Sequence, residues 1–175
     1  MTAEPASVAD YEAAVKRFKP ESDLAATNSN DLRRFVYEWF THFEHAAPAD
    51  FYLDHLAGVN LDVRFPGLDP ITSHAEFAGW YENLLAQTLW NFHDVSAIQI
   101  KRTAASQYLV TFVVDWYGEV RADSDQLAGW QSRTDSCLYH YFIRQTWTIT
   151  DEGRPVIQTL VAAGGDTPSP IQPDE

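Results

Sequence analysis

The sequence is poor in cysteine, in basic residues and in long hydrophobic runs, and each shortage excludes a class of protein. Cys137 is the one cysteine among 175 residues, so neither an internal disulfide nor a cysteine-rich metal site can form. Twelve Lys and Arg against 25 Asp and Glu give a formal net charge of -13, whereas nucleic-acid binding requires a basic face. No apolar run approaches the roughly 18 residues that cross a bilayer. We therefore expect neither a nucleic-acid partner nor a membrane partner.

The two ends of the chain differ in composition from its middle. Residues 1–28 are polar and rich in small residues, and residues 164–175 combine Pro, Gly and acids that offer nothing to bury. We expect an N-terminal arm at 1–28, a single domain at 29–163 and a flexible tail at 164–175. The start also lacks the basic and apolar regions of a signal peptide, so we expect a cytoplasmic protein.

Aromatic residues are abundant, with six Trp, eight Tyr and ten Phe in a strongly acidic chain. Aromatic rings on this scale indicate either a heavily aromatic core or an apolar ligand pocket.

The first half of the chain shows mainly helical spacing. One helix is predicted by apolar residues at positions 32, 35, 36, 39, 40 and 43. A shorter helix should follow Pro48 and end near Gly58, and a third should open with the capping box Ser73-x-x-Glu76 and end near Trp90. Between them, alternation over residues 59–65 predicts a strand.

The second half changes to period-two runs of aromatic and β-branched residues. Four long strands are predicted, at residues 93–102, 107–121, 130–149 and 156–162, with a hairpin turn at 151–153. Helices and strands do not alternate, so the order predicts an α+β fold. A curved antiparallel sheet would wrap over the three helices, and its concave mouth would be the natural ligand site.

Both faces of the middle strands are apolar. One subunit's core cannot hold both of these faces. The apolar residues of one face include Phe112, Val114, Tyr139 and Tyr141, and those of the opposite face include Val113, Leu138 and Phe142. One face should meet the helices and the other a second copy of the chain. We therefore expect a homodimer formed through the sheet.

Three short stretches carry a family resemblance: residues 63–67 (VRFPG), 73–81 (SHAEFAGWY) and 91–95 (NFHDV). With the order of elements, they resemble the nuclear transport factor 2-like superfamily, particularly its SnoaL-like polyketide cyclase, ketosteroid isomerase and scytalone dehydratase branches. The resemblance covers residues 30–163. It implies a cone-shaped antiparallel sheet around three N-terminal helices.

The catalytic acids of a ketosteroid isomerase are not matched. Its proton-abstracting Asp stands immediately before the Pro of the first stretch, where this chain has Phe65. Its phenol donor would fall near Trp39, and its second acid near Gln145. The resemblance therefore does not imply steroid isomerisation.

The scytalone dehydratase branch gives a partial match through Val-Tyr-Glu-Trp at 36–39. In that register a catalytic Tyr-Asp pair falls on Phe43 and Glu44, and one catalytic histidine falls on His93. The second histidine is not matched and would fall at Tyr117 or Gly118.

This resemblance makes His93 the candidate general acid or base, because an imidazole exchanges protons near neutral pH. Glu44 or Asp94 could fix its tautomer. The alternative is that His93 ends a strand and bonds backbone or water. The other expected ligand-binding residues are apolar or aromatic side chains facing the mouth: Trp39, Phe43, Phe65, Trp80, Tyr81, Leu84 and Trp116.

Two hypotheses for function follow. The first is binding of a hydrophobic, ring-containing small molecule with cofactor-free dehydration, isomerisation or cyclisation. The second is a noncatalytic binding or scaffolding protein, like the small subunits of ring-hydroxylating dioxygenases that share this fold.

The remaining polar candidates favour structural interpretations. His42 and His45, with Glu38, lie away from the apolar stripe of their helix, so we expect no metal site there. Asp62 and Arg64 share one strand face and could anchor a polar group, although a solvated pair is the commoner case. Three further histidines are expected at the surface or at caps: His55, His74 and His140.

Overall fold

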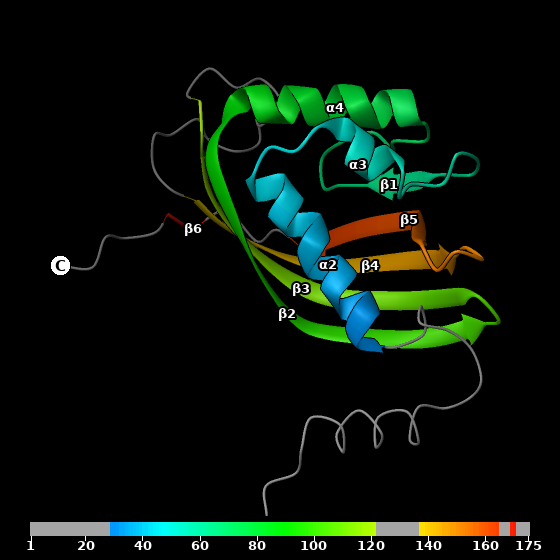
Figure 1. The fold of residues 1–175 in the computed structure, drawn as a ribbon. Coiled ribbons are helices and arrows are strands. Elements are labelled where there is room, and N and C mark those ends of the chain that lie inside the picture. The colour runs from blue at the N-terminus through cyan, green and yellow to red at the C-terminus, as the bar shows by residue number, and fades with distance from the viewer. Residues whose placement is uncertain (1–28, 122–136, 165–168, 171–175) are drawn as a thin grey trace, which may run out of the picture.

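A computed structural model of the chain describes residues 29–121, 137–164 and 169–170. Figure 1 shows three described helices lying against one face of a curved sheet. The helices are α2 (Ser29–Glu44), α3 (Ala49–Leu53) and α4 (His74–Gln87). The strands are β1 (Asp62–Arg64), β2 (Thr88–Ala104), β3 (Gln107–Val120), β4 (Cys137–Ile149), β5 (Pro155–Gly164) and β6 (Ser169–Pro170).

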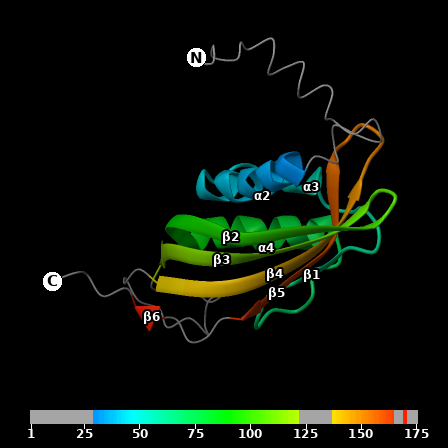
Figure 2. The same ribbon diagram turned by 90° about the horizontal axis from the view of Figure 1, so that it is seen from below.

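The sheet has the order β1-β5-β4-β3-β2, and β6 pairs with β4. All pairings among β2, β3, β4 and β5 are antiparallel, whereas the short edge strand β1 runs parallel to β5. Figure 2 shows the helices on one side of the curved sheet. The α+β prediction is thus confirmed, with the one correction that the sheet is mixed at its β1 edge.

Helix α2 packs on the sheet through the predicted apolar stripe. Leu32, Phe35, Val36 and Trp39 are all buried, at the spacing that places side chains on one helix face. Trp147 of β4 meets Phe35 edge-to-face, with ring centroids 5.1 Å apart. The core therefore lies between the helices and the concave face of the sheet.

Helix α4 begins at the predicted cap. The hydroxyl oxygen of Ser73 accepts the backbone N–H of Glu76 at 3.2 Å. The Glu76 carboxylate accepts from the backbone N–H of Thr72, one residue before the cap, at 2.7 Å. The helix ends at Gln87 rather than near Trp90, because Thr88 already has extended backbone angles and starts β2.

The alternation of the long strands separates the two faces of the sheet. On β3 the even-numbered residues are buried toward the helices, and on β4 the odd-numbered residues from Tyr139 to Ile149 face the same way, although Tyr141 is only partly buried. Phe142 points to the opposite face with 47% of its surface exposed. Within one subunit, the face toward the helices is therefore buried and the opposite face leaves Phe142 half exposed, as expected for strands that cannot bury both faces in one subunit.

Several predicted boundaries were wrong. The second helix is only five residues long, and Leu56 instead bridges to Ile157 of β5. The first strand is three residues long, because Asn60 has a positive φ of 55° and turns the chain just before it. The start of the third long strand, residues 130–136, lies outside the described part of the chain.

The predicted arm at 1–28 also lies outside the described residues. Within the predicted tail, Gly164 is the last residue of β5 and Ser169–Pro170 pair with β4. None of the described helices is long and apolar enough to cross a membrane.

Candidate functional site

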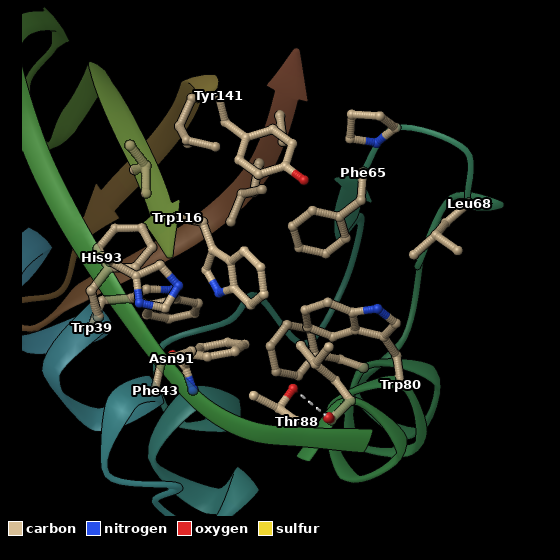
Figure 3. A pocket seen from close by; sticks show the side chains of 18 of the residues that line it. Trp39, Phe43, Phe65, Leu68, Trp80, Thr88, Asn91, His93, Trp116 and Tyr141 are labelled. Atoms are coloured by element: carbon tan, nitrogen blue, oxygen red, sulfur yellow. Dashed lines mark hydrogen bonds between the residues drawn. The ribbon is translucent and has the colours of Figure 1, made fainter. Parts of the chain in front are cut away.

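A cavity of about 250 Å³ lies between the concave face of the sheet and the helices α2 and α4. Side chains from α2, α4, β2, β3, β4 and β5 line it, together with the loop 65–68 that follows β1. Figure 3 shows His93 and Asn91 on one side and Phe65, Leu68 and Trp80 on the other. The cavity thus lies on the concave side of the sheet, where the sequence predicted a ligand site.

Aromatic rings form most of the walls. Phe65 stacks on Trp80 with centroids 4.5 Å apart and planes 17° apart, which closes one side. Trp116 lies across Gly118 on the inner face of β3, and a Cβ at Gly118 would be 2.3 Å from Cζ2 of the indole. The indole can occupy this position because residue 118 has no side chain. The walls therefore suit a flat apolar ligand.

His93 projects from β2 into the aromatic end of the cavity, where its side chain is only 7% exposed. The ring of Phe40 lies 4.8 Å from the imidazole and the ring of Phe43 lies 5.5 Å from it, centroid to centroid. Glu44, the last residue of α2, reaches the same place from the helix end. Its Oε1 accepts the backbone N–H of His93 at 2.7 Å and lies 3.5 Å from Nδ1 of the imidazole.

The surroundings shift both pKa values. Burial lowers the pKa of the His93 imidazole below its usual range, and the neighbouring Glu44 carboxylate opposes this only in part. For Glu44, burial acts to raise the carboxyl pKa, but the adjacent His93 imidazole, the backbone N–H of His93 and the nearby His45 together outweigh it and lower the pKa. The pair is therefore a neutral imidazole beside an ionised carboxylate at neutral pH.

Further polar groups border the cavity. The Thr88 hydroxyl donates to the carbonyl oxygen of Leu84 at 2.8 Å (Figure 3). Oε1 of Gln145 accepts the indole N–H of Trp147 at 2.7 Å. Burial raises the pKa of the Tyr141 phenol, so it remains protonated at neutral pH. The Oδ1 atom of Asn91 is buried and has no hydrogen-bond partner among the described residues.

Most of the predicted site residues come together here. The residues among them that line the cavity are Trp39, Phe43, Phe65, Trp80, Leu84, His93 and Trp116. Tyr81 departs from the prediction: it is fully buried in the core, and its hydroxyl donates to the carbonyl oxygen of Ala47 at 2.7 Å. Asp94, the alternative partner of His93, lies on the exposed face of β2, because successive strand residues point to opposite faces.

Asn91, Tyr141 and Leu68 also line the cavity, although they were not predicted as site residues. A signal was present for two of them. Asn91 lies two residues before His93 and so shares its face, and Tyr141 shares the inward face of Tyr139 and Ile143. Leu68 belongs to the turn after β1, where no period in the sequence fixes the direction of a side chain.

The histidines outside the cavity contact backbone carbonyl oxygens, aromatic rings or surface groups, and His55 packs against the buried ring of Phe35. Imidazole Nδ1 of His42 is 2.8 Å from the carbonyl oxygen of Glu38, and its ring stacks on Phe51. His55 and His74 are hydrogen-bonded to carbonyl oxygens of Pro155 and Leu56. Within the described part of the chain, no three His, Cys, Asp or Glu side chains are grouped as a metal site.

Asp62 and Arg64 form a solvated pair, with Nε and Oδ1 2.8 Å apart and the Arg64 side chain 58% exposed. Neither residue lines the cavity.

Comparison with known proteins relates the chain to others through structure alone. No protein-family model matches the sequence, and no curated protein matches it. Among solved structures, a protein described as a candidate scytalone dehydratase from Novosphingobium aromaticivorans is similar, with a TM-score of 0.66 at 13% identity. That match covers 86% of this chain and 94% of the other.

Two further structures show the same likeness. The hexachlorocyclohexane dehydrochlorinase LinA-type3 from Novosphingobium barchaimii has a TM-score of 0.66 at 12% identity, covering 86% of this chain and 94% of the other. A nuclear transport factor 2-like superfamily protein from Salmonella enterica has a TM-score of 0.63 at 10% identity, covering 82% and 95%. The chain therefore has the nuclear transport factor 2-like fold, as its resemblance implied.

Proposed function

We propose that this protein binds a hydrophobic, ring-containing small molecule in the aromatic cavity and transfers a proton to or from it without a cofactor. The observation that carries the proposal is His93, a buried imidazole that borders the cavity with the Glu44 carboxylate 3.5 Å from its Nδ1. The reaction class is dehydration, isomerisation, elimination or cyclisation. Structural relatives of the fold include proteins named as a dehydratase and a dehydrochlorinase, which supports an elimination.

The pair divides the work between its two members. The Glu44 carboxylate accepts the backbone N–H of His93, and this hydrogen bond holds Oε1 beside the imidazole. A proton on Nδ1 faces this carboxylate, which leaves the lone pair on Nε2 to accept a proton from the ligand. The imidazolium that forms is stabilised by the adjacent negative charge. His93 is thus the base or acid, and Glu44 orients it.

The aromatic walls supply binding and exclude water. Trp116 on one strand and the stacked Phe65 and Trp80 on the opposite side present ring faces and edges to the cavity. Ring-on-ring contact favours flat ligands, and exclusion of water keeps His93 in its neutral, proton-accepting form.

The test begins with the full chain purified under non-denaturing conditions. Native mass spectrometry is expected to find a bound compound that denaturation releases. The protein is then returned to that compound in D2O, and proton transfer appears as deuterium uptake or as conversion to a product. If the wild-type protein gives no deuterium uptake and no conversion, the catalytic proposal is wrong and only a binding function is left.

A noncatalytic binding or scaffolding protein is the second candidate. It is favoured by the lack of a second catalytic histidine. The resemblance to scytalone dehydratase would place that histidine at residue 117 or 118, but Tyr117 points to the outer face of β3 and Gly118 lies under Trp116. The cavity therefore has one histidine where that resemblance would supply two. The deuterium experiment separates the two candidates, because a scaffold would hold the compound and leave its hydrogens unchanged.

We also propose that two copies of the chain associate through the outer face of the sheet. Phe92 and Phe142 expose about half of their surface there, at 51% and 47%, and Val113 and Tyr117 lie between them. Figure 2 shows no described helix on this face. Light scattering at micromolar concentration should give about twice the 19.8 kDa chain mass, and Phe142→Glu should return it to one chain mass.

A further inference from the structure

Asn91 has a buried side-chain oxygen, Oδ1, that lies beside the cavity and accepts no hydrogen bond from the described residues. Its side chain lines the cavity next to His93, two residues away on the same face of β2 (Figure 3). Oδ1 is shielded from solvent, and no hydrogen bond to it is found among the described residues. The Nδ1 atom of His93 is also without a hydrogen bond, but it has the Glu44 carboxylate 3.5 Å away.

An unpaired carbonyl oxygen in such a position is unusual. The large majority of buried side-chain polar atoms in folded proteins have a hydrogen-bond partner, because an unpaired group loses its hydration without compensation. The terminal torsion of Asn is broad, so a small rotation can bring Oδ1 to the cavity surface. A donor on a bound molecule would meet the atom there and satisfy it.

Two neighbouring polar groups already have hydrogen-bond partners. The Thr88 hydroxyl uses its proton on the carbonyl of Leu84, and Oε1 of Gln145 receives the indole N–H of Trp147. Thr88 provides a matched comparison, since it lines the same cavity with a second oxygen that can accept a hydrogen bond from a ligand.

The size of the cavity limits the ligand. A cavity of roughly 150 Å³ holds benzene, so one of about 250 Å³ accommodates about ten non-hydrogen atoms, the size of two fused rings. We propose that Asn91 is a specificity-determining residue that accepts a hydrogen bond from a hydroxyl or N–H group on a bicyclic aromatic ligand. This inference rests on the proposed binding of ring compounds and adds the polar group the ring must carry.

The test uses indole and benzofuran as probes, because they have the same size and differ in an N–H donor against an ether oxygen. Binding of each probe to the full chain is measured by calorimetry or ligand-observed NMR for the wild type, Asn91→Leu and Thr88→Val. We expect the preference for indole, taken as the ratio of the two dissociation constants, to fall roughly tenfold in Asn91→Leu. Taking the ratio removes any general change in the apolar walls.

Thr88→Val is expected to leave the ratio within about twofold of the wild type, because the ligand's donor is directed to Asn91. A roughly tenfold fall in Thr88→Val alone would assign that donor to the Thr88 hydroxyl oxygen, which can still accept while its proton is bonded to Leu84, and would overturn the inference. Asn91→Ala, which removes the same oxygen without adding bulk, should repeat the result if Asn91→Leu does not fold. A ratio unchanged by loss of the Asn91 amide would overturn the inference and leave ring binding intact. Failure of both probes to bind the wild type would overturn both proposals.

Discussion

Two histidine–carboxylate pairs lie on opposite faces of the same sheet, and their surroundings give them different prospects. His93 on β2 faces the cavity with Glu44 beside it, and the two side chains are 7% and 21% exposed. His140 on β4 faces outward and contacts Asp115 on β3 at 2.5 Å, with 66% and 30% of their side chains exposed. The outer pair has the shorter contact but is open to water, which screens its charges. Burial beside a cavity, rather than contact distance, makes the inner pair the candidate for chemistry.

Replacement of each histidine by glutamine gives the largest expected difference between the pairs. His93→Gln keeps the approximate size and hydrogen bonding but cannot titrate, so proton-transfer turnover should fall about 10² to 10⁴-fold. His140→Gln should keep full turnover. The measurement is the rate of deuterium uptake or conversion of the co-purified compound. Full turnover in His93→Gln would show that His93 is structural and that the catalytic proposal is wrong.

Two glycines allow a second comparison, between a crowded position under the cavity wall at Gly118 and an open position on helix α4 at Gly79. Gly118→Ala places a Cβ 2.3 Å from the Trp116 indole and 2.9 Å from the carbonyl oxygen of Trp90. We expect the free energy of unfolding to fall by about 1 to 3 kcal/mol from overpacking, and indole and benzofuran to bind more weakly because Trp116 moves.

Gly79→Ala, on helix α4, is the matched control, since the added Cβ would meet no atom within 4 Å beyond its chain neighbours and the backbone of its own helix. There we expect a gain of about 0.5 to 1 kcal/mol from helix propensity and unchanged probe binding. Chemical denaturation and the probe titration measure both variants. If both variants lose the same stability, the position of the Trp116 indole does not require that residue 118 lack a side chain.

Acid should act on the inner pair through linkage. The pKa of His93 is lowered in the folded state, so the unfolded chain, with an imidazole pKa near ~6.5, binds more protons in the interval below that value. Stability from His93 is therefore complete above about pH 6.5 and is lost as the pH falls through the folded pKa. Glu44 acts in the same direction at lower pH, because its folded pKa is also lowered.

Thermal unfolding followed from pH 7.5 to 5.5 should therefore show a smaller loss in His93→Gln than in the wild type. Proton-transfer turnover should decline on the acid side with an apparent pKa below that of free imidazole. A decline centred above it would indicate a different base.

The smallest expected effect belongs to the outer pair itself. Exposed ion pairs contribute about 0 to 1 kcal/mol, so His140→Gln should lower the free energy of unfolding by less than about 1 kcal/mol. Urea denaturation measures it. A larger loss that depends on protein concentration would place His140 in the proposed interface between copies rather than in a solvated pair.

Much of the fold was predictable because it depends on local periods in the sequence. The stripe of α2, the Ser73 cap of α4 and the alternation along β3 each follow from side-chain direction alone. Residues such as Trp39 and Trp116 could be placed in the cavity from these periods and the family resemblance. Tyr81 could not, because helical spacing fixes a face but does not show how much core lies between that face and the cavity.

The tertiary structure decided the features that join distant segments or interrupt a period. Glu44 reaches His93 across 49 positions of the chain, and only the packing of α2 on β2 brings them together. Ala97, with a φ of 52°, lies in an irregularity of β2 between Ser96 and Gln99. Before Ala97 the inward residues are odd-numbered, as His93 and Val95 are, and beyond it they are Ile98 and Ile100. A bulge adds one residue to one strand, so its position depends on the partner strand and is absent from the sequence period. The sequence by itself determined which residues could face inward, and the pairing of strands decided which of them meet at one cavity.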